Sequence, residues 1–233
     1  KAISPSVAKM HVVGAVTKSD VSSSIKTIST KWKAKAVTIP TYKTPAAPTT
    51  AKVYFYDVPD AKQSQLRIGY PALARTDPDF YPAEVMNYIL GGGGFVSRLM
   101  KEVREKRGYA YSVYSHFQPL QQPGPFQIGL QPKREQASDA LKAVEEVLAE
   151  FLARGPSEDE LKAARRNLAD GFPLRIDSNR KLLDHIAVIG FYGLPLNYLD
   201  EFPRRIEAVT TAEIRAAFRR HIKPEHLVTV IVA

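Results

Sequence analysis

The chain has 233 residues, 44% of them apolar, and 33 Lys and Arg against 24 Asp and Glu give it a formal net charge of +9. A chain of this length can bury about 70 to 75% of the surface that its unfolded form exposes, which predicts a full hydrophobic core. The absence of cysteine excludes a disulfide framework, thiolate zinc ligands and a cysteine nucleophile. No apolar run approaches the ~18 to 20 residues of a membrane span, and the basic charge alone is compatible with nucleic acid, an anionic membrane surface or an acidic partner.

The N-terminal part predicts one strand and one helix followed by a linker. Lys9–Val16 has the composition of a strand, and Asp20–Lys35 can follow it as a short helix. Three prolines then exclude a helix: Pro40, Pro45 and Pro48. We therefore expect an extended linker over residues 37–50.

The next part predicts strands and helices in turn. Its elements are the strands Val53–Val58 and Ser64–Leu73, joined by a polar turn, the helices Tyr81–Leu90 and Phe95–Arg107, and the strands Tyr109–Gln118 and Pro125–Gln131. The apolar residues of the second helix recur at helical spacing and predict its buried face: Phe95, Val96, Leu99, Met100 and Val103. Gly108 stands where a left-handed C-terminal cap belongs.

The remainder is mainly helical. The predicted elements are helices over 135–152, 157–168, 178–192, 196–206 and 210–221, and a closing strand His226–Ala233. Ser157 with Glu160, and Thr210 with Glu213, have the spacing of capping boxes, which place two of the helix starts. Strands and helices together predict an α+β fold.

A repeated pattern suggests tandem domains. Ile3–Gly14 and Ile222–Ala233 both read as isoleucine, one residue, proline, a polar stretch and then an apolar strand. Two copies of one domain ending would make residues 1–36 the terminal strand and helix of a preceding homologous domain, and residues 51–233 the second domain. The alternative is coincidence in a short apolar pattern.

The glycine run Gly91, Gly92, Gly93 and Gly94 lacks the spacing of a phosphate-binding loop or a dinucleotide fingerprint, and a helix rather than a strand precedes it. Its amides could form an anion nest. A flexible hinge or a surface of close approach is the interpretation that the sequence favours.

The histidines predict no metal site. His221 and His226 in HIKPEH are five residues apart, and Pro224 between them breaks the helix on which a zinc motif would need to lie. His11, His116 and His185 are isolated in the sequence. No carboxylate pair has recognisable acid/base spacing and there is no nucleophile elbow, so the chain lacks the parts of a self-sufficient hydrolase.

Arg104 and Tyr111 are the remaining candidates for a site. Arg104 lies in the last turn of its predicted helix, and Tyr111 is third in the strand after Gly108, so the reversal can bring the guanidinium and the phenol toward one space. Both are hydrogen-bond donors, which suits binding a carbonyl oxygen or stabilising negative charge that develops on it. A surface arginine beside a half-buried tyrosine is the alternative.

The stretch LGGGGFVSRLMKEVREKRGYAYSVYS resembles the signature of the second domain in the insulinase and pitrilysin family of zinc peptidases, which includes the mitochondrial processing peptidase and bacterial homologues. The resemblance continues through residues 193–233 and back to SPSVAKMHVVGAV. It implies paired α+β domains, each an antiparallel sheet with helices packed on it, arranged as a clam shell around a peptide-sized chamber. In that family the first domain carries zinc through H-x-x-E-H, a motif that this chain does not contain.

The resemblance implies roles for two residues. Arg104 would hold a substrate backbone carbonyl, and Tyr111 would hydrogen-bond near the scissile carbonyl and help stabilise the tetrahedral intermediate. The glycine run resembles the mobile glycine loop of the processing peptidase's noncatalytic subunit, which makes Gly91 to Gly94 weaker candidates for substrate contact.

Several questions stay open at this point. The chain is expected to be either the C-terminal piece of a peptidase or a noncatalytic subunit, inactive alone in both cases, with zinc and the cutting chemistry in a homologous partner. A scaffold without catalysis is the alternative, and a nucleic-acid binder, suggested by charge alone, is not expected. Residues 3–35 could pair with a neighbouring chain to give a homodimer, and the bacterial periplasm and the cytoplasm are both compatible with the sequence.

Overall fold

The computed structural model describes residues 3–233, and these form two compact units. The larger unit comprises residues 44–170 and 202–233, and the smaller unit comprises residues 3–43 and 171–201. No helix in the described residues is long and apolar enough to cross a membrane. The predicted boundaries at residues 36 and 50 remain predictions, although residues 33–48 form neither helix nor strand, as expected for a linker.

The larger unit is built on a five-stranded sheet with the order β1-β5-β2-β4-β3. Its strands are β1 (Lys52–Tyr56), β2 (Gln65–Leu73), β3 (Ala110–Phe117), β4 (Gly124–Pro132) and β5 (Val228–Val232). Pairing is antiparallel except between β1 and β5, which run parallel, so the sheet is mixed where the resemblance implied an antiparallel one. The chain belongs to the α+β class, as predicted.

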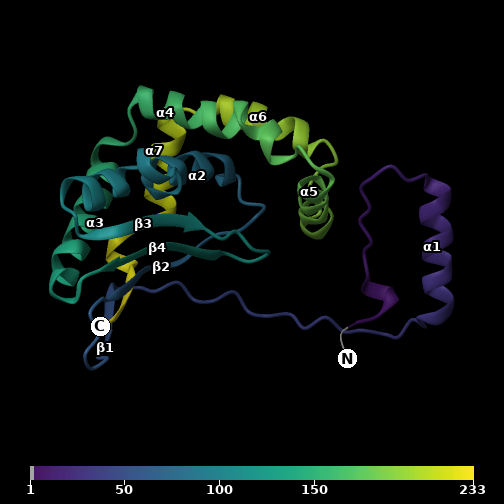
Figure 1. The fold of residues 1–233 in the computed structure, drawn as a ribbon, viewed down its shortest axis with the longest axis horizontal. Coiled ribbons are helices and arrows are strands. Elements are labelled where there is room, and N and C mark those ends of the chain that lie inside the picture. Colours follow the sequence, from purple (N-terminus) through teal and green to yellow (C-terminus); the bar gives the residue numbers. More distant parts are fainter. Residues whose placement is uncertain (1–2) are drawn as a thin grey trace. The chain divides into compact units, whose positions relative to one another are not determined.

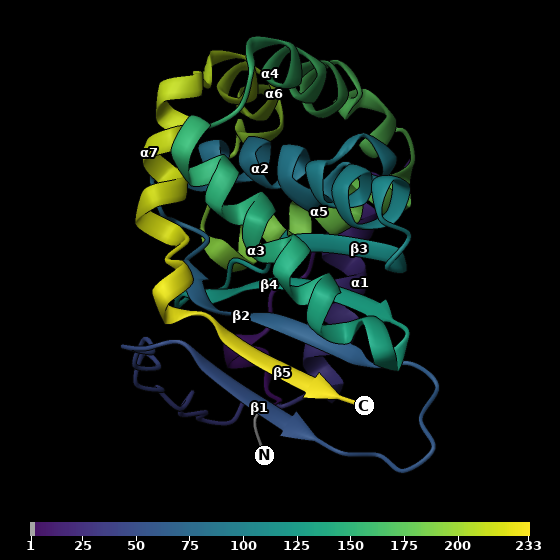
Figure 2. The ribbon, with the colours of Figure 1, turned by 90° about the vertical axis from the view of Figure 1, so that its left-hand side faces the viewer.

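One detail of the sheet goes beyond the two predicted strands and the turn that joins them. The turn at residues 57–64 joins β1 to β2, but the two strands are not neighbours, because β5 lies between them (Figure 2). Neighbouring strands lie about 4.8 Å apart, so an eight-residue connection easily crosses the extra strand. The partner of β1 comes from the far end of the chain, which local sequence patterns do not reveal.

Helices lie on one side of this sheet, some directly on it and others packed on those (Figure 1). They are α2 (Phe80–Asn87), α3 (Ala137–Arg154), α4 (Glu158–Arg165), α7 (Thr211–His221) and the part of α6 (Tyr198–Ala208) that follows residue 201. Both predicted capping boxes are present, since the Ser157 and Thr210 hydroxyls each accept from the backbone N–H three residues on. Alternate residues of β2 point into the core against these helices, namely Leu66, Ile68 and Tyr70.

Aromatic stacking joins α3 to α7 in the core. The rings of Phe151 and Phe218 lie 4.5 Å apart and both side chains are fully buried. At the same, C-terminal end of α7, the buried Tyr70 hydroxyl donates to the His221 carbonyl and accepts from the Lys223 N–H. The first and last parts of the larger unit are therefore tied together by both apolar and polar contacts.

The smaller unit contains α1 (Lys18–Lys31) and α5 (Asn179–Tyr192). The predicted strand Lys9–Val16 is not formed, because these residues belong to no strand or ladder among the described residues. Lys9 instead donates to the carbonyl of Gly190 on α5. A strand needs a neighbour to satisfy its backbone, and the smaller unit holds no other extended segment in a ladder with it.

Replacing Phe218 with alanine tests the aromatic core. We expect Phe218→Ala to lower the free energy of unfolding by about 3 to 5 kcal/mol, because the cavity would lie in a site that is fully buried. Urea denaturation followed by far-UV circular dichroism measures the change. The control Phe55→Ala removes the same ring from β1, where it is 62% exposed, and a loss there as large as at Phe218 would contradict this account of the core.

Candidate functional site

A pocket of about 610 Å³ lies where the glycine run, the following helix and β3 meet in the larger unit. The helix comprises residues 98–99 and the π-helix Met100–Lys106, and a 3-10 turn at Gly94–Val96 precedes it. The pocket is lined by Asn87, Gly91, Gly92, Gly94, Phe95, Met100, Arg104, Tyr111, Ser112, Val113, Tyr114, Ser115 and His116. Helix and strand thus contribute side chains from both sides of the Gly108 reversal.

The structure brings Arg104 and Tyr111 together in this pocket. Gly108 has a φ of 65°, the left-handed value that its predicted role as a helix cap requires. The chain reverses there, and the guanidinium carbon of Arg104 comes to lie 4.5 Å from the centre of the Tyr111 ring. Tyr111 is 83% exposed, so its hydroxyl is available to a bound molecule.

Phe95 is a pocket residue that the sequence interpretation placed in the core. Its ring centre lies 4.6 Å from the guanidinium carbon of Arg104, and the side chain is 61% exposed. The predicted helix begins only after residue 97, so Phe95 and Val96 lie in the exposed 3-10 turn while Leu99, Met100 and Val103 form the buried face. An aromatic residue directly after four glycines was the available signal, because glycine permits the turn that displaces it.

Close packing explains three of the four glycines. A Cβ on Gly91 would lie 2.4 Å from the Ser115 backbone nitrogen, and one on Gly93 would lie 2.6 Å from the Tyr88 carbonyl oxygen. A Cβ on Gly92 would lie 2.5 Å from the side-chain nitrogen of Asn87. Gly94 is different, since nothing crowds it but its φ is 61°. The run is therefore a surface of close approach ending in a left-handed turn, which was one of the two interpretations that the sequence favoured.

Behind the pocket, one hydrogen bond connects β3 to the end of α2. The buried Ser115 hydroxyl donates to the Asn87 side-chain oxygen at 2.8 Å, next to the point where Gly91 approaches β3. This bond and the glycine contact hold the wall of the pocket against the sheet.

His116 lies at the pocket, stacked on Tyr114 with 5.9 Å between ring centres. Burial, with a smaller effect from the nearby Arg67, lowers the pKa of His116 below its ordinary value. The imidazole is therefore neutral at pH 7. Among the residues that line this pocket, the charge is therefore carried by Arg104.

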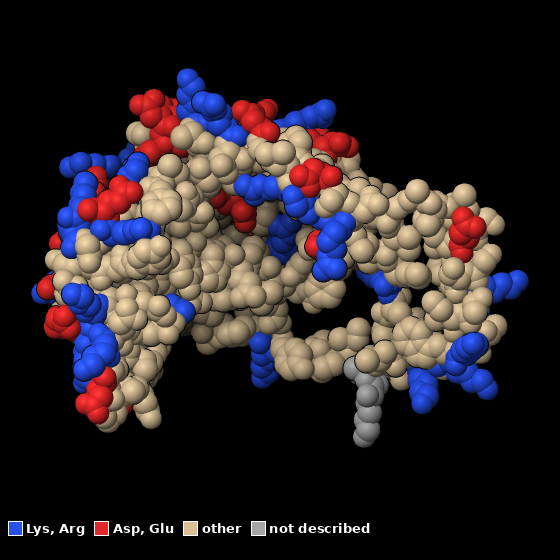
Figure 3. Space-filling view, viewed as in Figure 1, with Lys and Arg blue, Asp and Glu red and all other residues tan. Residues whose placement is uncertain are grey.

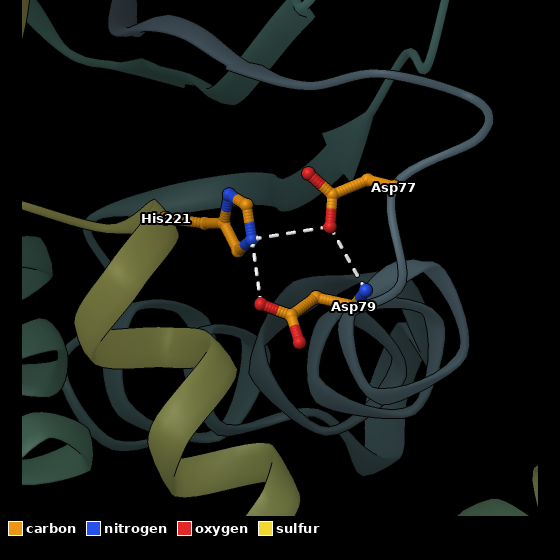
Figure 4. Close-up of side chains that lie close together, drawn as sticks. All are labelled: Asp77, Asp79 and His221. Carbon is orange, nitrogen blue, oxygen red and sulfur yellow. Dashed lines mark hydrogen bonds and ion pairs between the residues drawn. The ribbon is translucent and has the colours of Figure 1, made fainter.

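A second cluster lies at the junction of α2 and α7. His221 Nε2 lies 2.9 Å from an Asp79 oxygen and 3.8 Å from an Asp77 oxygen (Figure 4). These atoms are close enough to one another for a metal ion. Both Asp79 oxygens, however, also accept from Arg220, each at 2.6 Å. The cluster is therefore arranged as an ion-paired clamp between two helices.

The sequence did not predict this clamp. The only neighbour considered for His221 was His226, which lies in the 3-10 turn Pro224–His226 and outside the cluster. The actual partners of His221 are more than 140 residues away, at the start of α2. No local spacing could have found them.

Alanine substitutions test the two reasons for glycine in this run, which are close packing at Gly91 and a left-handed backbone at Gly94. Gly91→Ala should destabilise the chain by about 3 kcal/mol, because its Cβ would collide with backbone, whereas Gly94→Ala should cost about 1 kcal/mol for its left-handed conformation. Urea denaturation of both variants measures the difference. A larger loss at Gly94 than at Gly91 would show that backbone conformation, and not close packing, dominates in this run.

The Asp79 clamp predicts a pH dependence. Its hydrogen bonds from Arg220, aided by His221, lower the pKa of Asp79 below its usual value. A carboxyl with a depressed folded pKa stabilises the fold above its unfolded pKa of about 3.9, and this contribution is lost as pH falls below that value. Asp79→Asn should therefore cost about 1 kcal/mol at pH 7 and progressively less toward pH 3.

Thermal unfolding at several pH values, compared with the wild type, checks this prediction. Asp139→Asn is the matched control, because Asp139 is exposed and lies 4.0 Å from Lys142 in a surface pair. The clamp would be refuted if the loss of stability in Asp79→Asn, relative to the wild type, were the same at pH 3 as at pH 7.

Comparison with known proteins identifies the family. Residues 1–168 match the family described as the peptidase M16 inactive domain. An uncharacterised zinc protease of Streptomyces coelicolor is 34% identical over 158 residues, which cover 68% of this chain and 34% of that protein. A protein of Helicobacter pylori described as a non-peptidase homologue is 30% identical over 178 residues, covering 75% of this chain and 40% of the other. The chain thus spans well under half the length of either relative.

Solved structures agree with the fold. The peptidase M16 inactive domain from Pseudomonas fluorescens superposes with a TM-score of 0.84 at 35% identity, over 93% of this chain and 51% of that one. A protease from Helicobacter pylori superposes with a TM-score of 0.85 at 19% identity, over 95% of this chain and 54% of that one, and shares the fold. The resemblance seen in the sequence is confirmed, and the chain belongs to the peptidase M16 inactive-domain family.

Proposed function

We propose that this chain positions a peptide for cleavage by a zinc-bearing homologous domain or subunit. The observation that carries the proposal is the convergence of Arg104 and Tyr111 in one solvent-open pocket, on either side of the Gly108 reversal. The pocket is of a size that suits a short stretch of peptide. Its lining combines apolar and aromatic surface with a few hydrogen-bond donors, which is the composition of most small binding sites.

The two residues have complementary roles in this proposal. Arg104 donates to an oxygen of the bound peptide and holds the peptide in place. The Tyr111 hydroxyl donates to the scissile carbonyl oxygen as negative charge develops on it. A donor aimed at this oxygen lowers the activation barrier, because its hydrogen bond to the tetrahedral intermediate is stronger than its hydrogen bond to the ground state.

The cutting chemistry belongs to the partner. Zinc held there would activate the attacking water, and this chain supplies neither the metal ligands of an H-x-x-E-H motif nor a nucleophile. The name of the Streptomyces relative, a zinc protease of which this chain matches about one third, supports a partner region of that kind. Residues 9–16 have the composition of a strand but form none among the described residues, which supports a partner strand from a homologous domain or from a second copy of the chain.

A scaffold role without catalysis is the second candidate. It is favoured by the Helicobacter relative, which is described as a non-peptidase homologue. In a scaffold the Arg104 and Tyr111 pair would be surface residues without effect on turnover. Nucleic-acid binding is not favoured, because Lys and Arg alternate with Asp and Glu over the helices of the larger unit on the face shown in Figure 3.

Reconstitution with the zinc-bearing domain or subunit of the same organism tests the proposal. Tyr111→Phe should lower kcat/KM for peptide cleavage by about 10² to 10³, since one hydrogen bond to the developing oxyanion is removed. Arg104→Ala should act mainly by raising KM, because its contact is present in the ground state as well. A quenched-fluorescence peptide assay, with this chain alone as the baseline, measures both.

Matched controls lie directly after the same helix and directly before the same strand. Arg107→Ala removes the same charge outside the pocket, where Arg107 pairs with Glu146, and Tyr109→Phe removes a phenol two residues before Tyr111. Both controls should stay within a few-fold of wild type. Cleavage within twofold of wild type in both Arg104→Ala and Tyr111→Phe would leave the scaffold role as the surviving candidate.

A further inference from the structure

The charge of Arg104 is not balanced by any carboxylate in residues 3–233. The residues three and four positions from Arg104 along the chain are Met100, Lys101, Arg107 and Gly108, none of them acidic. Glu102, on the same helix, pairs with Lys106 instead. Neighbouring arginines show the contrast, since Arg98 pairs with Glu160 at 2.7 Å and Arg107 pairs with Glu146 at 2.6 Å.

Two rings hold the guanidinium in place while leaving its donors free. Phe95 and Tyr111 contact it at 4.6 and 4.5 Å, distances typical of a cation above an aromatic face. In the described residues no hydrogen bond from the Arg104 guanidinium to an acceptor accompanies these contacts. A stacked guanidinium with free N–H groups presents a planar fork that matches a carboxylate, because two parallel hydrogen bonds can form.

The rest of the pocket suits a negative group. The residues that line it include no aspartate or glutamate. The Ser112 and Tyr114 hydroxyls and the Asn87 amide are neutral, and His116 has a lowered pKa. An incoming carboxylate therefore meets one cation and no repelling charge from the pocket lining, and its charge-assisted hydrogen bonds to Arg104 are stronger than those of a neutral carbonyl.

We propose that Arg104 receives a carboxylate of the bound peptide, so that the pocket selects acidic peptides over neutral ones of the same shape. This inference rests on the proposed function, because it specifies the chemistry of the peptide that the pocket positions. The carboxylate comes either from an aspartate or glutamate side chain or from the peptide's own C-terminus. Phe95 acts as a positioning residue, since its ring holds the guanidinium in the orientation that the carboxylate meets.

Binding of matched peptides to the full chain tests the inference without any cleavage. One fluorescein-labelled sequence is prepared in two pairs, with internal Glu or Gln, and with a free or an amidated C-terminus. Anisotropy titration should show about tenfold tighter binding of the carboxylate member of at least one pair, as expected for a charge-assisted hydrogen bond at a half-exposed site. The pair that shows the preference identifies the source of the carboxylate.

Three variants assign the preference to Arg104. Arg104→Gln keeps a long polar side chain but should abolish the preference, and Arg107→Gln, which removes a charge from the same helix outside the pocket, should retain it. Phe95→Leu keeps apolar bulk without the ring and should reduce the preference severalfold while the binding of the neutral peptide changes little. Far-UV circular dichroism confirms that each variant is folded.

The outcomes separate this inference from the proposed function. Equal binding of acidic and neutral peptides would overturn the inference and leave peptide positioning intact, as would a preference that survives Arg104→Gln. Failure of every peptide to bind would overturn both. A preference lost equally in Arg104→Gln and Arg107→Gln would show a general effect of net charge, and it too would overturn the pocket as the source of selection.

Discussion

The pairing of β5 between β1 and β2 is the constraint on which the rest of the larger unit depends. This strand comes from the last residues of the chain, yet it forms ladders with both of the first two strands. Its position brings α7 back across the sheet, where Phe218 stacks on Phe151 of α3. Without β5, β1 would have no ladder partner in the described residues and the end of α7 would not reach Tyr70.

Polar contacts then determine where α7 ends. The Tyr70 hydroxyl bridges the His221 carbonyl and the Lys223 N–H, and burial raises the pKa of this phenol. Asp79, at the start of α2, accepts from both Arg220 and His221 on α7. Because α2 continues into the glycine run, the clamp at one end of α2 and the pocket at its other end belong to one packed layer.

The pocket itself is a consequence of backbone packing. Gly91 can touch the backbone of β3 because it has no Cβ, and Ser115 bonds Asn87 at the same place. The turn that follows places Phe95 outside the core, where it meets Arg104. The close packing of helix and strand at the glycine run therefore also creates the site in which two rings hold a charged side chain.

The smaller unit and the end of the chain share a 3-10 turn that begins with proline, but only the second turn leads into a strand. Pro5–Val7 and Pro224–His226 both form 3-10 turns, and the residue after each turn is extended, while the repeated domain ending itself stays a prediction. After the second turn the chain enters a ladder as β5, whereas after the first it has no strand partner in the described residues. The difference lies in the surroundings of the two segments.

The sequence by itself determined the elements that depend on local chemistry. Capping boxes at Ser157 and Thr210, the left-handed glycine at 108 and the alternation along β2 all act over a few residues, and the predicted elements agree with them. The spacing of Arg104 and Tyr111 across one reversal is equally local, so their meeting could be predicted. Tertiary structure alone decided the place of β5, the partners of His221 and the exposure of Phe95, because each depends on residues brought from far along the chain or on how closely two backbones pack.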